Sequence, residues 1–393
     1  MNSIVIIANE FPYPPTHGGK VDVWRRICAL KELGARVCLV AWADPQVTDD
    51  AASIDAVRTV VDELILLPFH DGFLHKLRQL RGSLFLPRSV SNRSLTDVRF
   101  QSVLLKVKDF APDIIFLDSV YGYLLAEKLV KYLGIRLYYR SHNIEHLYLK
   151  KQFLLARKPR DRIKWFFNSR GMESLEFKAI GLASRFYDIS FEDLVFWQQK
   201  GFQHGHWLPP VVDIKLALRL SAGNNYSPEY DVGYLGNLFM PNNVNGLVWF
   251  LKKVVPAIRS KSPRARIFIA GSKPVQELLD LAKLAGVDVL ANPPDIVPVL
   301  RNARVLVNPV FAGSGVNVKS VEMLFTPCQL VATPIGLGGL PDQVKKCFFQ
   351  AEDPQDFANL VLTAINSFGA IDMDERNKAR THFLPEAAGL ILQ

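Results

Sequence analysis

A loop in the C-terminal half contains two glycines and leads directly into a predicted helix. Gly313 and Gly315 flank Ser314, and the loop connects an apolar stretch at 304–310 to a helix expected from about Val316. Glycines let the backbone approach a ligand closely, and the first amides of a helix carry partial positive charge. The pattern indicates a binding site for a diphosphate.

Two charged residues follow on this predicted helix. Lys319 lies in the first turn, where its ammonium can add a full positive charge to the diphosphate site. Glu322 comes three residues later and shares a helix face with Lys319. Its carboxylate is too far along to oppose the phosphates, but it can accept hydrogen bonds from both hydroxyls of a ribose. A surface ion pair between the two residues is the alternative.

Other predicted strands of this half end in residues that can approach the same ligand. Glycine loops after two of the strands offer close backbone approach, and a lysine after a third offers a cation. That lysine is equally well interpreted as a solvated loop residue. These residues are Gly236 with Asn237, Gly338, and Lys273.

In the N-terminal half, the predicted strand 136–142 ends in polar residues, among them Arg140 and His142. At the end of a strand, the His142 Nε2 atom can hydrogen-bond a substrate oxygen; a structural histidine is the alternative. His142 and His146 also have the spacing of an inverted zinc-peptidase motif. That motif needs both histidines within a helix, whereas His142 follows a strand-like run, so we expect no metal.

Gly18 and Gly19 lie between the first predicted strand and the helical pattern at 21–33. Amides at the start of this helix can receive an anion or a sugar hydroxyl, although a purely structural turn explains the glycines as well. The loop lacks the G-x-G-x-x-G pattern, so a dinucleotide is not expected here.

Short apolar runs alternate with amphipathic helical patterns along the chain. Such alternation predicts parallel sheets covered by helices on both faces. We therefore predict an α/β protein with two Rossmann-like, doubly wound domains that face one interdomain cleft, with ligands at the carboxyl ends of the strands. The predicted strands are 3–8, 36–43, 114–117, 136–142 and 186–190, then 232–235, 266–270, 287–290, 304–310 and 329–333.

The series breaks once, at Pro209 and Pro210 and the polar stretch 221–230. We expect domains at 1–210 and 211–373, with a linker at about 211–230. The remaining helical segment, 374–393, is expected to return to the N-terminal domain.

Composition excludes several classes of protein. The chain has 393 residues, of which 49% are hydrophobic, so it is neither disordered nor fibrous. It contains no apolar run long enough to span a membrane, and residues 1–8 lack the basic start of a signal peptide. The four cysteines form no C-x-x-C pair and are expected to be reduced. We expect a cytoplasmic protein.

The net charge of +9 is unevenly distributed. Residues 150–170 contain eight lysines and arginines against Asp161 alone, interleaved with aromatic residues, and a second basic cluster runs through 76–99. Cationic helices with aromatic residues suit an anionic membrane surface, so we expect peripheral association with the inner membrane face. A solvated helix face is the alternative. Nucleic acid is not expected, because no recognition motif accompanies the charge.

Taken together, these residues resemble the GT-B glycosyltransferases, specifically glycosyltransferase family 4, and the C-terminal half is similar to bacterial exopolysaccharide sugar transferases. The resemblance covers nearly the whole chain and is most specific in the C-terminal half. It is carried by YLGNLFMPNNV at 234–244, PVFAGSGVNVKSVE at 309–322, the loop 331–340, the prolines and glycines of 12–19, and RSHNIE at 140–145.

The resemblance implies a hexosyltransferase that takes a sugar from a UDP- or GDP-linked donor, held by the C-terminal domain. The acceptor, a glycan or a lipid-linked sugar, is implied to bind the N-terminal domain through Gly18, Gly19, Arg140 and His142. Retention of configuration, no metal, no cofactor and a role in cell-surface polysaccharide synthesis are implied as well. The implied donor-binding residues are Gly236, Asn237, Lys273, Gly313, Ser314, Gly315, Val316, Lys319, Glu322 and Gly338.

The family pattern gives three residues catalytic roles. His142 matches the histidine that contacts the donor sugar, and Glu322 matches the glutamate that holds the ribose. Ser314 stands where the family has another glutamate, and asparagines replace the arginine and lysine that clamp the diphosphate, which leaves Lys319 as the remaining cation. A nucleotide-sugar epimerase, or a catalytically idle nucleotide-sugar-binding homologue, stays open as an alternative.

Overall fold

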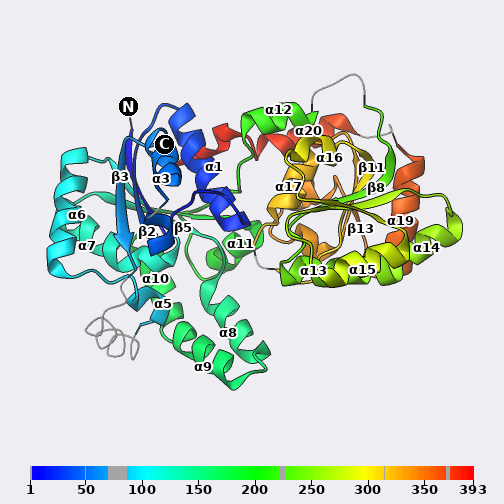
Figure 1. The fold of residues 1–393 in the computed structure, drawn as a ribbon. Helices are drawn as coiled ribbons and strands as arrows, with labels where there is room; N and C mark the ends of the chain where they lie inside the picture. The colour runs from blue at the N-terminus through cyan, green and yellow to red at the C-terminus, as the bar shows by residue number, and fades with distance from the viewer. Residues whose placement is uncertain (1, 49, 70–85, 222–225, 314, 369–371) are drawn as a thin grey trace. The chain divides into compact units, whose positions relative to one another are not determined.

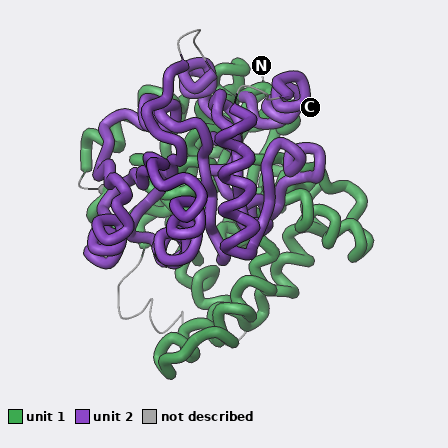
Figure 2. Tube along the Cα trace, turned by 90° about the vertical axis from the view of Figure 1, so that its right-hand side faces the viewer, with its two compact units in different colours: residues 1–211, 385–393 green, residues 212–384 purple. Residues whose placement is uncertain are grey.

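The computed structural model divides the chain into two compact units, residues Met1–Val211 with Pro385–Gln393, and residues Val212–Leu384 (Figures 1 and 2). It describes residues 2–48, 50–69, 86–221, 226–313, 315–368 and 372–393. Ser314 and the part of the second basic cluster at 76–85 therefore lie outside the described residues. Each unit is built on one parallel sheet.

In the described residues, the sheet of unit 1 has seven parallel strands in the order β3-β2-β1-β4-β5-β6-β7. The strand order reverses beside β1, which is the point where doubly wound folds place their ligands. The strands are β1 Ser3–Ala8, β2 Arg36–Ala43, β3 Glu63–Pro68, β4 Ile114–Asp118, β5 Arg136–Ser141, β6 Arg185–Asp188 and β7 Gly205–Trp207.

Both faces of this sheet are buried. Along β1, Val5 and Ile7 belong to one apolar core, whereas Ile4 and Ile6 belong to another. Because side chains alternate across a strand, one core lies on each face. The covering elements are α1 Gly18–Glu32, α2 Pro45–Thr48, α3 Ala51–Arg58, α5 Arg88–Ser91, α6 Asp97–Phe110, η1 Val120–Gly122, α7 Tyr123–Leu133, α8 Glu145–Leu155, α9 Pro159–Ser169, α10 Met172–Leu182, α11 Phe191–Gln199 and η4 Pro385–Leu392.

Helices α8 and α9 form a hairpin that extends away from the sheet of unit 1 (Figure 1). None of the residues of α9 is buried. This exposure agrees with its sequence, because α9 carries three cations and an amphipathic helix of this charge has little apolar surface to bury. Within the described ranges, no helix is both long enough and apolar enough to cross a membrane.

In the described residues, the sheet of unit 2 has six parallel strands in the order β10-β9-β8-β11-β12-β13. They are β8 Tyr230–Leu235, β9 Ile267–Gly271, β10 Asp288–Ala291, β11 Ala303–Asn308, β12 Gln329–Ala332 and β13 Phe349–Gln350. The other elements are α12 Ile214–Ser221, α13 Pro241–Trp249, η2 Phe250–Val254, α14 Val255–Lys261, α15 Gln276–Ala285, α16 Ile296–Leu300, α17 Val318–Leu324, η3 Pro334–Leu337, α18 Asp342–Lys345, α19 Pro354–Asn366 and α20 Met373–Thr381.

Two Rossmann-like units and every predicted strand are present, so the α/β fold class is confirmed. The strands β3, β7 and β13 were not predicted. The last two are only three and two residues long, too short to show a pattern. The expected linker at 211–230 contains helix α12, which packs on α16.

The unit boundaries lie at 211 and 385. Helix α20 belongs to unit 2, where it contacts α17 and α18, and the chain returns to unit 1 at Pro385 rather than at 374. The returning turn η4 packs on α1.

Candidate functional site

Lys319 is the centre of a polar cluster at the strand ends of unit 2. It is the second residue of α17, and the Asn317 side chain caps the helix by accepting a hydrogen bond from the Lys319 amide at 3.2 Å. The ammonium Nζ donates to Tyr234 Oη at 3.0 Å, Asn243 Oδ1 at 3.1 Å and Asn308 Oδ1 at 3.3 Å. Residues from β8, α13 and β11 therefore hold one side chain of α17.

All three hydrogen-bond partners of this ammonium are neutral oxygens. Burial lowers the pKa of Lys319 to about 7, and the charge of Glu322 only partly opposes this shift. Desolvation disfavours the charged form because nearby dipoles replace water incompletely. The nearby ring of Tyr234, whose centroid lies 4.5 Å from Nζ, adds a weaker cation–π attraction. An anion bound here would restore the positive charge.

Asparagines and a serine fix these oxygens in position. Asn308, at the end of β11, donates from Nδ2 to Ser320 Oγ at 2.8 Å, and Ser320 in turn donates to the Gly336 carbonyl at 2.7 Å. Asn308 and Ser320 are both buried. Because β11, α17 and η3 are tied together in this way, Asn308 Oδ1 can face only the lysine.

The loop after β8 is tied in the same manner. Asn243 Nδ2 donates to the Asn237 carbonyl at 2.9 Å, and Asn237 Oδ1 accepts from Ser272 Oγ at 2.9 Å. Asn243, which stands among the asparagines that replace the cations of the family pattern, therefore contacts Lys319.

Two glycines allow this close packing. A Cβ atom on Gly236 would lie 2.6 Å from Tyr234 Oη and 3.1 Å from Lys319 Cε. A Cβ atom on Gly271 would lie 1.6 Å from the Gly236 carbonyl oxygen, and Gly271 has a positive φ of +152°. Only glycines at both positions let the ends of β8 and β9 meet beside the lysine.

The structure also places the other residues predicted to bind the donor. Gly315 has a φ of +66°, and the carbonyl oxygen of Gly315 is 4.0 Å from the Cβ position of Gly338, so the two glycine loops adjoin. Helix α17 begins at Val318, later than predicted, and is only seven residues long. Val316 is buried and precedes the helix. The N-terminus of a helix carries only a partial positive charge, so the charged form of Lys319 is the main positive group of the site.

Of the remaining donor-site residues, Gly313 is exposed, with open space around its Cβ position, and Glu322 is half-buried on α17. Lys273 is exposed after β9, and its ammonium lies 5.8 Å from the ring centroid of Phe239. The structure does not bring Lys273 into the polar cluster of Lys319.

Unit 1 contains a second cluster of charged groups, at the ends of β4 and β5. Arg140 donates to Asp22 at 2.6 and 3.2 Å, and also to the Leu208 carbonyl at 3.0 Å. Its side chain is fully buried. Its guanidinium faces Asp22 and has no exposed surface, so the structure places Arg140 in the interior rather than on a surface open to an acceptor or sugar.

Arg26 links the two carboxylates of this cluster, donating to Asp22 at 3.0 Å and to Asp118. Burial by itself would raise the pKa of Asp118, but the charges of Arg26, His142 and Arg140 hold it well below its usual value. The pKa of Asp22 is lowered in the same way. Both carboxylates therefore stay ionised at neutral pH.

His142 lies at the edge of this cluster, directly after β5. Its Nε2 atom is 2.7 Å from Asp118 Oδ1, and its Nδ1 atom is 3.8 Å from Asp22 Oδ2. The His142 side chain is 19% exposed, whereas both aspartates are buried. The Nε2 atom, which was expected to bind a substrate oxygen, instead pairs with Asp118, and the two carboxylates orient a ring that stays partly exposed.

The zinc alternative fails on geometry. His142 precedes α8, and the ring of His146 faces Glu176, with Nδ1 at 2.6 Å from Oε2. Among the described residues, no group of three or more His, Cys, Asp or Glu side chains could hold a metal ion.

Gly18 and Gly19 are exposed at the start of α1, where the preceding His17 makes no side-chain cap.

The sequence reasoning did not single out Asp22, Arg26, Asp118, Tyr234 or Asn308. Asp118 and Asn308 are the last residues of β4 and β11, so the rule that ligand residues follow strands could have found them. Asp22, Arg26 and Tyr234 lie within elements, where a single sequence gives no such signal.

Residues 229–367, which lie within unit 2, match the family model Glycosyl transferases group 1. An uncharacterized 44.6 kDa protein in the cps region of Klebsiella pneumoniae is 25% identical over 378 residues, which cover 92% of this chain and 90% of that protein.

Solved structures share the fold over the whole chain. Alr3699/HepE from Anabaena, in complex with UDP, has a TM-score of 0.65 at 15% identity, covering 100% of this chain and 98% of its own. Sucrose-phosphate synthase from Thermosynechococcus elongatus has a TM-score of 0.67 at 14% identity, with 100% and 97% covered. The resemblance to GT-B glycosyltransferases is therefore confirmed.

We expect the substitution Arg140→Met to destabilise unit 1, because it leaves Asp22 buried with one cation fewer. Breaking a buried ion pair in this way costs about 3–5 kcal/mol. Arg136→Met is the matched control, since Arg136 is exposed at the start of the same strand and surface substitutions usually change stability by about 0.5 kcal/mol or less. Denaturant midpoints measure both. Equal midpoints for the two variants would contradict the structural role of Arg140.

Proposed function

We propose that this chain, a GT-B protein whose C-terminal unit matches the glycosyl transferases group 1 family, moves a sugar from a UDP- or GDP-linked donor to a glycan or lipid-linked acceptor. The observation that carries the proposal is the ammonium of Lys319, desolvated among neutral oxygens at the strand ends of unit 2. The cps-region relative supports a role in cell-surface polysaccharide synthesis.

In the proposed donor complex, the diphosphate lies against Lys319 and the adjoining glycine loops of Gly315 and Gly338. Cleavage of the bond between sugar and phosphate leaves additional negative charge on the diphosphate. A positioned cation in a site with little water stabilises this developing charge more than it stabilises the ground state. Glu322, one turn further on α17, accepts the ribose hydroxyls.

In unit 1 we assign His142 to the sugar at the reaction centre, with Asp118 and Asp22 orienting its ring. Gly18 and Gly19, exposed at the start of α1, remain our assignment for the acceptor. We propose same-face transfer with retention of configuration, in which a diphosphate oxygen accepts the proton of the acceptor hydroxyl. The proposed reaction uses no metal, because Lys319 supplies the charge at the leaving group, and it needs no cofactor.

UDP or GDP is expected to raise the melting temperature of the wild-type protein. A ligand at one hundred times its Kd stabilises the folded state by about 2.7 kcal/mol. Lys319→Met is expected to abolish most of this rise in melting temperature. It is also expected to slow the release of nucleotide diphosphate from the donor about a hundredfold or more. Glu322→Ala should weaken nucleotide binding, because the contact with the ribose hydroxyls is lost. Lys252→Met, an exposed lysine of the same unit, is the control. Wild-type turnover in Lys319→Met would refute this donor site.

Binding of UDP at pH 8 is expected to take up about one proton. In the ligand-free protein the pKa of Lys319 is about 7, so the amine is mostly neutral at pH 8. A bound diphosphate favours the charged form and raises that pKa, so affinity falls as the pH rises above 7. Calorimetry in buffers of different ionisation enthalpy measures the proton uptake. The same uptake in Lys319→Met would assign it to another group.

The α8–α9 hairpin is our proposed site of contact with an anionic membrane surface at the inner face. It combines the cations of 150–170 with exposed apolar side chains, among them Leu154 and Leu155, which are 68% and 63% exposed. Apolar groups that insert beside cations are typical of interfacial helices. This surface would place a cytoplasmic enzyme beside a lipid-linked acceptor.

Flotation with liposomes tests this contact. The protein is expected to float with vesicles that contain anionic lipid and to stay behind with neutral vesicles. The triple variant Lys150→Gln, Lys151→Gln, Arg157→Gln should bind about a hundredfold more weakly, at about 1 kcal/mol for each cation near the surface. The triple variant Lys252→Gln, Lys253→Gln, Lys261→Gln loses the same charge from unit 2 and should float normally. Equal flotation with both kinds of vesicle would count against an electrostatic contact.

A further inference from the structure

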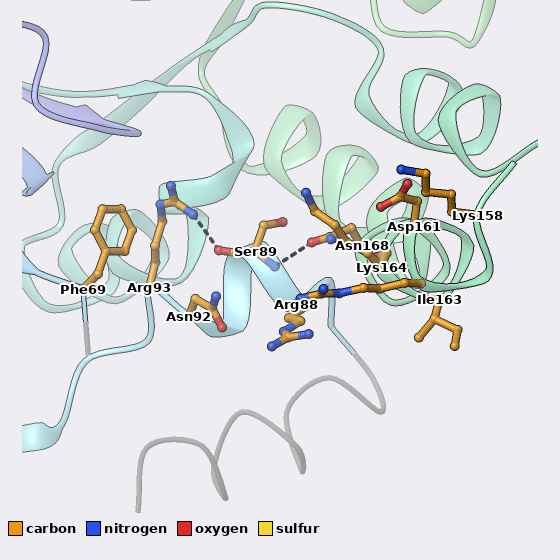
Figure 3. A pocket seen from close by; sticks show the side chains of 11 residues that line it. Phe69, Arg88, Ser89, Asn92, Arg93, Lys158, Asp161, Ile163, Lys164 and Asn168 are labelled. Carbon is orange, nitrogen blue, oxygen red and sulfur yellow. Dashed lines mark hydrogen bonds between the residues drawn. The ribbon is translucent and has the colours of Figure 1, made fainter. Parts of the chain in front are cut away.

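A basic cavity of about 900 Å³ lies in unit 1 between α5 and α9 (Figure 3). Among the described residues that line it, five are cations and Asp161 is the one acid. The cations come from two separate segments, α5 with its following turn and α9 with the residue before it. They are Arg88, Arg93, Lys158, Arg160 and Lys164.

The wall of the cavity is held in place by hydrogen bonds. The Ser89 amide donates to Asn168 Oδ1 at 3.0 Å, which joins α5 to α9. Arg93 donates to the Ser89 carbonyl at 2.7 Å and to the Asn9 carbonyl at 3.1 and 3.2 Å. Burial lowers the pKa of Arg93 to about 10, so this guanidinium is still charged at neutral pH. At least one cation of the wall is thus fixed before any ligand binds.

Two oxygens of the same wall have no hydrogen-bond partner in the described structure. These are Ser89 Oγ and Asn92 Oδ1, both buried atoms. Buried polar atoms are nearly always paired, so a ligand or ordered water is expected to complete them. A hydroxyl can donate to a phosphate oxygen, as Ser89 would do beside the cations. Ser89 and the cations together fit an anion with several oxygens, whereas Asn92 Oδ1 is an acceptor and needs a donor such as a water molecule.

A smaller cavity of about 280 Å³ adjoins the first and shares Phe69 and Arg93 with it. Its lining includes Glu10 after β1 and Asp44 after β2, at the strand ends beside the point where the order of the sheet reverses. Carboxylates at such a point can accept the hydroxyls of a sugar. Arg93 therefore lines both cavities, the smaller one suited to sugar hydroxyls and the larger one suited to phosphate.

We propose that the larger cavity binds the diphosphate of a lipid-linked acceptor, while the acceptor sugar occupies the smaller cavity. Ile163 lines the larger cavity and is 60% exposed, and Phe166 on the same helix is also exposed, so an apolar chain can leave the cavity along α9. This inference rests on the proposed glycosyltransferase function. It assigns the acceptor class and separates the acceptor's phosphates from those of the donor at Lys319.

The test uses calorimetry on the full chain with saturating UDP present, which keeps the donor site occupied. The probes are geranyl diphosphate, inorganic pyrophosphate and geraniol. Geranyl diphosphate is expected to bind more tightly than pyrophosphate, and geraniol is expected not to bind. The double variant Arg160→Gln, Lys164→Gln should bind geranyl diphosphate about tenfold or more weakly, because charge-assisted contacts to phosphate are lost. Both side chains are exposed, so the variant is expected to fold.

The control is Lys108→Gln, Lys131→Gln, which removes the same charge from exposed positions of α6 and α7. Undiminished binding in the cavity variant, or an equal loss in the control, would overturn the proposal. Equal affinities for pyrophosphate and geranyl diphosphate would show a site for free anions and overturn the lipid assignment. The donor site is judged separately by the UDP melting experiment with Lys319→Met, so failure here leaves that result standing.

Discussion

A buried lysine whose three hydrogen-bond acceptors are neutral oxygens is the feature around which the polar cluster of unit 2 is built. Tyr234, Asn243 and Asn308 position the Lys319 ammonium without neutralising it. A carboxylate in their place would form a closed ion pair and compete with any anionic ligand. Neutral partners leave the charge available, and the cost appears as the lowered pKa of the lysine. Gly236 leaves room for the Lys319 side chain, and Gly271 lets β9 approach the Gly236 carbonyl. The serines at 272 and 320 hydrogen-bond the asparagines of this cluster.

In unit 1, by contrast, the buried charges are paired with one another. Asp22, Asp118, Arg26 and Arg140 form a buried group in which each charge faces an opposite one. Such a group offers no site for an ion, but it fixes the end of β5 and hence the ring of His142. The two units thus differ in how they use charge: unit 2 keeps a lysine whose hydrogen-bond partners are neutral, whereas unit 1 keeps an oriented imidazole beside paired charges.

Much of this fold could be predicted from the sequence, because buried parallel strands appear as continuous apolar runs and their ends mark candidate residues, as for His142. Lys319 could be predicted from the glycine loop that precedes its helix. The direction of a side chain on such a strand could not be predicted. Both faces of β5 are covered, so no alternation shows that Arg140 points into the protein. The pairing of Arg140 with Asp22 spans 118 residues and arises only from tertiary structure. The same holds for Lys319, whose partners come from three other elements.

The structure offers three groups of cations for anions, and they differ in exposure. Lys319 is desolvated, so its attraction is strong at short range and linked to its protonation. The cations of α8 and α9 are exposed, so they act at longer range and are screened by salt. Arg93 lies between these cases, half-buried yet charged at neutral pH. In the enzyme that we propose, the exposed charges would gather an anionic acceptor, while Lys319, whose pKa is lowered to about 7, would hold the leaving diphosphate without trapping it.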